Sequence, residues 1–171
     1  DEDTAIKIAT EIINNFEKIY KNKWLNMMRD KLGLFGEHTN DIELINDLLS
    51  WMENNKADYT NTFCYLMNIK LHDSEIYNDK SFINWFNVWK KRSLMNNGSK
   101  EKQLDIMQNV NPSVIPRNHK VEEALKAAND DNFKVMNKLL SVLNKPYDNQ
   151  KNIKEYQSPT DNKEYQTFCG T

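Results

Sequence analysis

The chain has 171 residues, which fits one domain or part of one and is long enough to bury a core. Its hydrophobic fraction of 39% and charged fraction of 28% exclude a disordered chain, and its net charge of −2 excludes a general attraction to nucleic acid or to an anionic membrane. No apolar run approaches the ~20 residues of a membrane span, so no membrane partner is expected.

Other features of the composition bear on the origin of the chain. Two cysteines, Cys64 and Cys169, are too few for a disulfide scaffold, and a reducing cytoplasm is therefore the expected compartment. The acidic first residues resemble neither a signal nor a transit peptide, and the missing initial Met indicates a piece of a longer protein. Lys, Asn and Ile are abundant and Arg is scarce, a bias that we attribute to an AT-rich genome.

Helical periodicity dominates the first half of the chain. The longest predicted helix covers residues 4–32 and ends at Gly33 and Gly36, where glycine can adopt a left-handed conformation. A second helix follows Asn40, which with Glu43 forms a capping-box pattern, and a third follows Asp58. A fourth is predicted over residues 79–95. The apolar stripe of the first helix consists of Ile6, Ala9, Ile13, Phe16, Tyr20, Trp24, Met27 and Met28.

Three shorter helices are predicted in the second half of the chain. The fifth covers residues 100–110 and is ended by Asn111-Pro112, because proline removes a backbone donor. The sixth begins near His119, and the seventh is capped by Asp131 or Asn132. After residue 143 the periodicity fades. The sequence therefore predicts an all-α fold: an irregular bundle of about six to seven helices in a domain of residues 1–143, followed by an extended polar tail of residues 144–171.

The residues that support common catalytic sites are missing or scattered. The four glycines form no phosphate-binding loop, and His38, His72 and His119 lie far apart in the sequence, so neither a cofactor-binding residue nor a metal ligand is predicted. Cys64 lies among apolar residues of a helix, which favours packing over nucleophilic chemistry. No catalytic residue is predicted.

Two polar groups allow more than one interpretation. Trp85, Trp89 and the basic residues 90–92 could bind nucleic acid, but their helical spacing favours a core stripe with a basic, solvated edge. Arg117, Asn118 and His119 follow a proline-bounded loop, where Arg117 could bind a carboxylate or phosphate. The structural interpretation, which we favour, is a polar anchor in which Arg117 fixes the loop and Asn118 caps the helix.

Cys169, third from the end, is the remaining candidate. On a polar tail its thiol could be oxidised or could pair with another cysteine, and it could equally be an idle surface thiol. The sequence leaves both interpretations of Cys169 open.

Several short sequences, taken in order, resemble the carboxy-terminal part of the selenoprotein O family, also called the YdiU or UPF0061 family. The resemblance covers nearly the whole chain, and the ordered set is more specific than any single motif. The segments that carry it are residues 28–34, 58–60, 111–112, 115–119, 121–122 and 124–125, then Pro146-Tyr147, Tyr156, Pro159 and residues 167–171.

The resemblance implies a kinase-like protein adenylyltransferase, which transfers AMP from ATP to hydroxyl side chains of proteins with Mg or Mn. The ATP-binding and metal-binding residues of the family lie upstream of the matched part, so the segment alone is expected to be inactive. Its expected partners are the upstream kinase-like domain and the protein substrates of the whole enzyme. An apolar patch left bare without that domain is also expected. The alternative is a free-standing helical adaptor that binds another protein.

The family resemblance also bears on the thiol near the carboxy terminus. Some members end in a pair of cysteines, or a cysteine and a selenocysteine, separated by two residues. Cys169 matches the second position of that pair, whereas Gln166 stands at the first, so a local redox pair is not expected. The resemblance leaves a regulatory bridge from Cys169 to a cysteine of the kinase-like part as the expectation.

Overall fold

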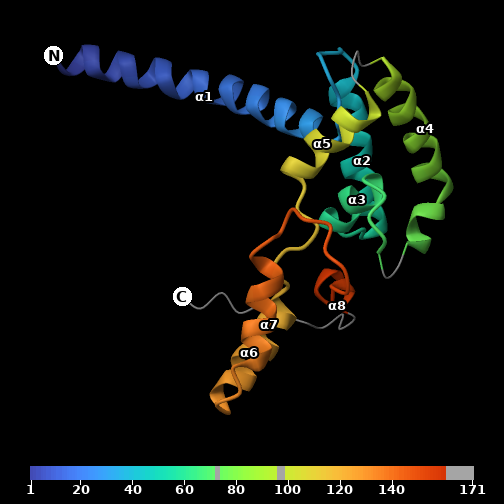
Figure 1. The fold of residues 1–171 in the computed structure, drawn as a ribbon. Coiled ribbons are helices and arrows are strands. Elements are labelled where there is room, and N and C mark those ends of the chain that lie inside the picture. The colour runs from blue at the N-terminus through green and yellow to red at the C-terminus, as the bar shows by residue number, and fades with distance from the viewer. Residues whose placement is uncertain (72–73, 96–98, 161–171) are drawn as a thin grey trace.

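The computed structural model describes residues 1–171 except 72–73, 96–98 and 161–171, and the regular structure in these residues is entirely helical (Figure 1). This confirms the all-α prediction. The helix η1 is a 3-10 turn, and neither η1 nor the short α8 was predicted from the periodicity. The elements are α1 (Glu2–Lys31), α2 (Asp41–Asn55), α3 (Tyr59–Leu66), η1 (Glu75–Asn78), α4 (Lys80–Leu94), α5 (Lys100–Val110), α6 (Asn118–Asn129), α7 (Lys134–Leu143) and α8 (Lys154–Gln157).

Some of the predicted helix N-caps form in the structure and others do not. The carboxylate of Asp58 accepts a hydrogen bond from the backbone N–H of Asn61, as predicted for α3. Asp79, which was not predicted as a cap, caps α4 by accepting from the N–H groups of Ser81 and Phe82. Asn40 lies at the start of α2 without a side-chain capping bond, so the capping-box prediction is wrong. Asn118 begins α6 with Arg117 at the N-cap position, so the prediction that Asn118 caps this helix is also wrong.

The larger core joins the last turns of α1 to α2, α3, α4 and α5. Phe63 and Phe82 are its largest fully buried side chains, and aromatic rings from α2, α3, η1 and α4 contact one another around Phe82. Trp85 and Trp89 are buried in it, and their indole N–H groups donate to the carbonyls of Leu44 and Leu32. Each indole thus satisfies its polar atom while its rings fill the core.

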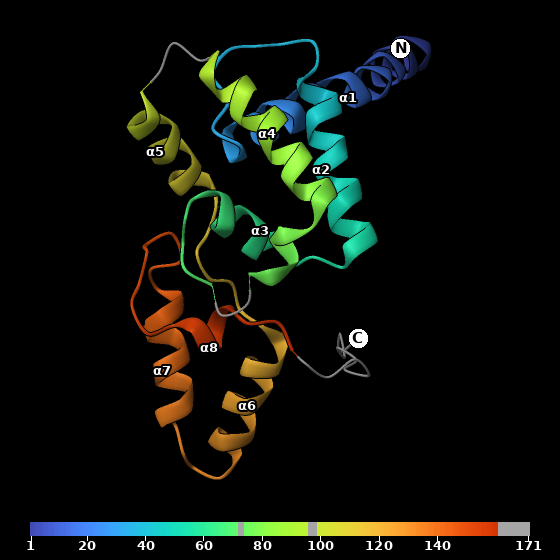
Figure 2. The same cartoon turned by 90° about the vertical axis from the view of Figure 1, so that its right-hand side faces the viewer.

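A smaller core lies between α6, α7 and the segment that follows them. The antiparallel pair α6 and α7 forms a separate hairpin, with α8 packed beside it (Figure 2). Ile153 and Tyr156, from the segment predicted to be an extended tail, are buried in this core. Part of that segment, residues 144–160, therefore packs on the helices, whereas residues 161–171 lie outside the described part of the chain. The division into a domain of residues 1–143 and a tail stays a prediction.

The loop of residues 111–117 connects the two cores. Its Ser113 donates from the backbone N–H and from the hydroxyl to the carbonyl of Pro146, and from the hydroxyl to that of Asp148. Asn111 ties the start of the loop to the end of α1, because its amide donates to the carbonyl of Lys31 and accepts from the Lys31 ammonium. The two prolines and these hydrogen bonds fix the path of the loop between the cores.

Gly33 is required where α1 ends. It has φ +63, and a Cβ at this position would lie 2.5 Å from Cγ of Gln103 and 2.9 Å from Cγ of Met107. Gly36 has a similar φ of +68, but a Cβ there would meet no neighbouring atom within 4 Å. We expect Gly33→Ala to lower the free energy of unfolding by about 2 kcal/mol, from backbone strain plus overpacking, and Gly36→Ala by about 1 kcal/mol from strain alone.

Urea denaturation of the two alanine variants measures this difference. Equal losses at Gly33 and Gly36 would show that α5 yields to the added methyl group without cost.

Candidate functional site

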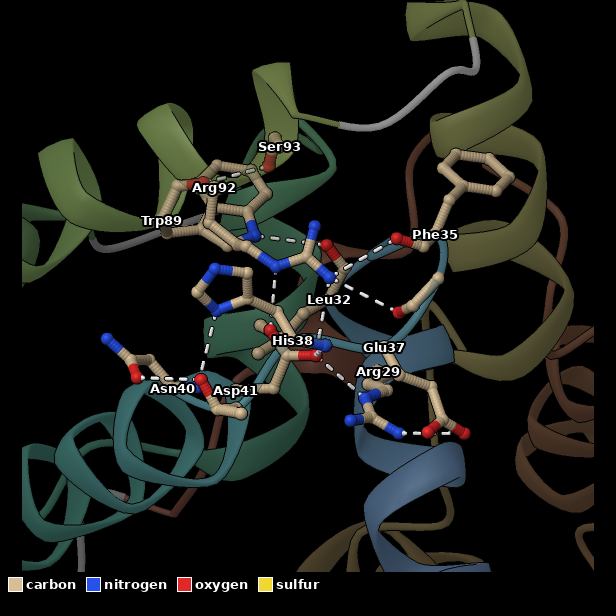
Figure 3. A network of polar contacts seen from close by, with 12 residues as sticks. Arg29, Leu32, Phe35, Glu37, His38, Asn40, Asp41, Trp89, Arg92 and Ser93 are labelled. Carbon is tan, nitrogen blue, oxygen red and sulfur yellow. Dashed lines mark hydrogen bonds and ion pairs between the residues drawn. The ribbon is translucent and has the colours of Figure 1, made fainter.

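A buried network of charged side chains joins α1, α2 and α4 around Asp41, the first residue of α2 (Figure 3). Its carboxylate has no exposed surface and accepts from Nε of Arg29 at 2.8 Å and from Nε of Arg92 at 2.7 Å. The backbone N–H of His38 donates to the same carboxylate at 3.0 Å. Each oxygen of Asp41 therefore meets a cationic donor from a different helix.

The same arginines hold the loop between α1 and α2. One terminal nitrogen of Arg92 donates to the carbonyls of Phe35 and Gly36, at 3.2 Å each. Arg29 donates to the side chain of Asn26 at 3.0 Å and lies 3.7 Å from the carboxylate of Glu37. The prediction that residues 90–92 form a solvated basic edge is wrong for Arg92, which is buried, whereas Lys90 and Lys91 are exposed.

The electrostatics of Asp41 favour a structural carboxylate that is ionised at neutral pH. Burial raises the pKa of Asp41, but the hydrogen bonds from Arg92, Arg29 and the His38 N–H outweigh it and hold the pKa below its ordinary value. A general base needs access to the proton that it removes, and this carboxylate is enclosed by its donors. The network can fix three helices and a loop, and it offers no reactive oxygen to a substrate.

A second network joins the two cores through Arg117. Its two terminal nitrogens donate to the carboxylate of Asp58 at 2.6 and 2.9 Å, a bidentate pair. One of them also donates to the carbonyl of Gln157 in α8 at 2.8 Å. The amide of Asn61 donates to the same carbonyl. Arg117 therefore links the start of α3 in the larger core to α8 in the smaller one.

The other sequence-predicted candidates are Asn118, His119 and Cys169. Asn118 is exposed, and His119 is half-buried on the first turn of α6. Cys169 lies outside the described residues. The arrangement thus brings Arg117 together with Asp58, which was predicted only as a helix cap, and with Gln157, which the sequence did not single out.

The arginines of the two networks share one signal that the sequence reasoning did not use. The chain contains 23 Lys and Arg residues, and Arg29, Arg92 and Arg117 are its only arginines. All three are largely buried and paired with a carboxylate. Only guanidinium offers a planar, bidentate set of donors that stays charged when buried. In a chain that otherwise uses lysine, the three arginines all lie at largely buried positions where they meet a carboxylate.

Comparison with known proteins gives the family. A model of the family described as protein adenylyltransferase SelO matches residues 4–144. The chain belongs to the SelO family. It is 50% identical over 173 residues to protein nucleotidyltransferase YdiU of Pelagibacter ubique (strain HTCC1062), an alignment that covers 100% of this chain and 36% of that relative. The YdiU protein of Alkaliphilus metalliredigens (strain QYMF) is 44% identical over 174 residues, which cover 100% of this chain and 35% of the relative.

These relatives confirm the resemblance, and they give the extent of the match. The SelO-family chain spans about a third of the length of the curated relatives that it matches. Since both alignments cover the whole chain, both networks and the whole of α1 lie within the part shared with these relatives.

The cavities of this SelO-family segment differ in their linings, and one of about 730 Å³ between α2 and α4 is lined largely by polar side chains. Another of about 450 Å³ lies between α4 and α5, with an aromatic and aliphatic lining that includes Phe86, Trp89 and Met107, and with Lys90 and Lys100 as its charged groups. Within the described residues, no three His, Cys, Asp or Glu side chains are grouped to hold a metal ion. None of the described helices is long and apolar enough to cross a membrane.

Burial of Cys64 confirms its interpretation as a packing residue. The side chain has no exposed surface, and burial, with the nearby Asp58 carboxylate, raises the pKa of its thiol to about 12. Since the thiolate is the reactive form, we expect Cys64 to resist alkylation in the native protein and to react once the protein is unfolded in urea. Mass spectrometry of the Cys64 peptide after maleimide treatment measures this, and rapid native labelling would contradict it.

Proposed function

We propose that this chain is the carboxy-terminal helical segment of a kinase-like protein adenylyltransferase of the bacterial cytoplasm. In the whole enzyme, AMP passes from ATP to Ser, Thr or Tyr hydroxyls of protein substrates. ATP and Mg or Mn bind in the kinase-like part that precedes this segment. The observation that carries the proposal is the SelO family match over residues 4–144, together with relatives about three times as long.

The geometry supports a bracing role for the segment within that enzyme. Its three arginines hold helices together instead of facing an open cleft, and the carboxylate of Asp41 is fully enclosed. A rigid helical body of this kind can position the kinase-like part without contributing reacting groups. The regulatory role of Cys169 rests on the family resemblance alone and belongs to this proposal.

The experiment compares the full-length protein with the isolated 171-residue chain. Each is incubated with ATP labelled at the α-phosphate, Mg or Mn, and a bacterial protein extract. We expect labelled proteins with the full-length protein and none with the isolated chain. Labelling by the isolated chain would overturn the bracing role, and a well-folded full-length protein that labels nothing would overturn the proposed activity.

A free-standing adaptor remains the second candidate, and one observation favours it. The first two thirds of α1 expose large apolar side chains, as an adaptor that binds another protein would. Sequencing the gene before residue 1 separates the two functions. A reading frame that continues into a kinase-like domain supports the enzyme, and a start codon close to residue 1 supports the adaptor.

A further inference from the structure

The first two thirds of α1 extend away from the rest of the molecule (Figure 1). Only the last part of the helix contributes to the larger core, through Met28 and, partly buried, Trp24 and Leu25. The preceding residues are exposed although many of them are large and apolar. Their exposed fractions lie between 53% and 70% for Ile6, Ile8, Ile12, Ile13, Phe16, Ile19 and Tyr20.

The spacing of these side chains defines a wide apolar face, here called the α1 face. Three rows run along the helix at seven-residue intervals: Ile6, Ile13 and Tyr20; Ala9 and Phe16; and Ala5, Ile12 and Ile19. The first two rows alone would form the narrow seam of a two-stranded coiled coil, whereas the third row widens it. Three apolar positions in seven are typical of a helix buried against several elements of a globular body.

The opposite side of the helix argues against a membrane surface as the occupant. Helices that lie on membranes carry an excess of Lys and Arg on the polar side. Here the charges are balanced, because the polar side of α1 carries three acidic residues and three lysines before the core-packed end: Asp3, Glu11, Glu17, Lys7, Lys18 and Lys21. The wide apolar face and mixed polar side instead fit a groove in a soluble protein body.

The length of the relatives indicates which protein body contains that groove. The chain covers only 36% of the Pelagibacter relative, while the alignment includes the whole of α1. We propose that the α1 face docks in an apolar groove of the remaining two thirds of the same polypeptide, and this inference rests on the proposed function as part of a longer enzyme. A second copy of the chain is the competing occupant.

Docking also explains how this stretch of helix is stabilised. About 20 helical residues without tertiary contacts are marginal in water, because packing of an amphipathic face supplies most helical stability. The backbone hydrogen bonds of this stretch should therefore open readily when the α1 face is bare and stay closed when the face is covered. Amide hydrogen exchange distinguishes these two states.

The first measurement is hydrogen exchange, followed by mass spectrometry, on peptides that span residues 4–20. In the monomeric full-length protein we expect exchange roughly 100-fold slower than in the isolated chain. Fast exchange in the full-length protein would overturn the inference. Protection that appears only in a dimer, and is lost on dilution, would assign the α1 face to a second copy and overturn it as well.

A pair of variants in the full-length protein adds a matched control. Phe16→Asp places a charge at the centre of the α1 face, and Asn14→Asp places the same charge on the opposite side of the helix. We expect Phe16→Asp to increase exchange of residues 4–20 at least about 10-fold and Asn14→Asp to leave it unchanged. Equal effects would contradict docking. If Phe16→Asp fails to fold, the wild-type comparison still decides the question.

AMP transfer measured on the same preparations separates this inference from the proposed function. Protection of α1 without AMP transfer would leave the docking in place and remove the activity. Transfer without protection would do the reverse.

Discussion

Asp41→Asn is expected to lower the free energy of unfolding by about 3–5 kcal/mol, the largest single effect that the described structure predicts. The change keeps the shape of the side chain but leaves Arg29 and Arg92 buried without a counter-charge. The new amide group also presents N–H donors to guanidinium groups that are themselves donors. Urea denaturation of wild type and variant gives the difference.

The control for Asp41 removes the whole network. Replacing Arg29, Asp41 and Arg92 together by Met, Leu and Met takes away the charges and their desolvation cost at once. Such replacements are often close to neutral, so we expect the triple variant to be more stable than Asp41→Asn alone. A triple variant as unstable as the single one would show that the individual hydrogen bonds, and not the uncompensated charges, carry the effect.

The network also makes stability depend on pH in a defined direction. Because the pKa of Asp41 is lower in the folded state, its contribution is fully present above the ordinary carboxyl pKa of about 4 and is lost as the pH falls through the folded-state value. Asp79 adds to the same acid sensitivity, since hydrogen bonds from Ser81 and Trp51 hold its pKa at about 2. Asp41→Asn should therefore flatten the loss of stability below pH 4 without abolishing it, as urea titrations at pH 3 to 6 would measure.

The sequence predicted the helices well because apolar periodicity and local caps are properties of neighbouring residues. The seven predicted helices have counterparts in α1–α7, and Asp58 caps the start of α3 as predicted. The stripe that contains Trp85 and Trp89 is buried, as its spacing indicated. Short elements such as η1 and α8 were missed, since four residues contain too little of a period to be seen.

The polar networks could not be predicted in the same way. Asp41 lies 12 residues from Arg29 and 51 residues from Arg92, and the contact between them depends on how three helices pack. Arg117 and Asp58 are 59 residues apart. Local reasoning therefore placed Arg92 on a solvated edge and offered Arg117 a carboxylate or phosphate without identifying Asp58 as the partner. The scarcity of arginine could have indicated these buried positions, although it does not identify the carboxylate with which each arginine pairs.

Arg117→Met is expected to lower the free energy of unfolding by about 3 kcal/mol. The change keeps the apolar part of the side chain but removes the guanidinium from the Asp58 carboxylate and from the Gln157 carbonyl. The Asp58 carboxylate is less enclosed than that of Asp41, so the cost should be smaller than at Asp41. Arg117→Lys should recover only part of the loss, because lysine cannot form the bidentate pair.

The region in which amide exchange increases shows whether Arg117 holds the two cores together or only stabilises the protein as an ordinary ion pair. If Arg117 joins the cores, its loss should increase amide exchange mainly in residues 144–160, which include α8, while α2 and α4 stay protected. Lys120→Met, in the first turn of α6 just after Arg117, is the matched control, because the pairs of Lys120 with Glu123 and Glu155 are more exposed and should contribute about 0–1 kcal/mol. Uniform exchange across both cores, or equal losses at Arg117 and Lys120, would show that the smaller core is held to the larger one by its loop and apolar contacts, with the ion pair secondary.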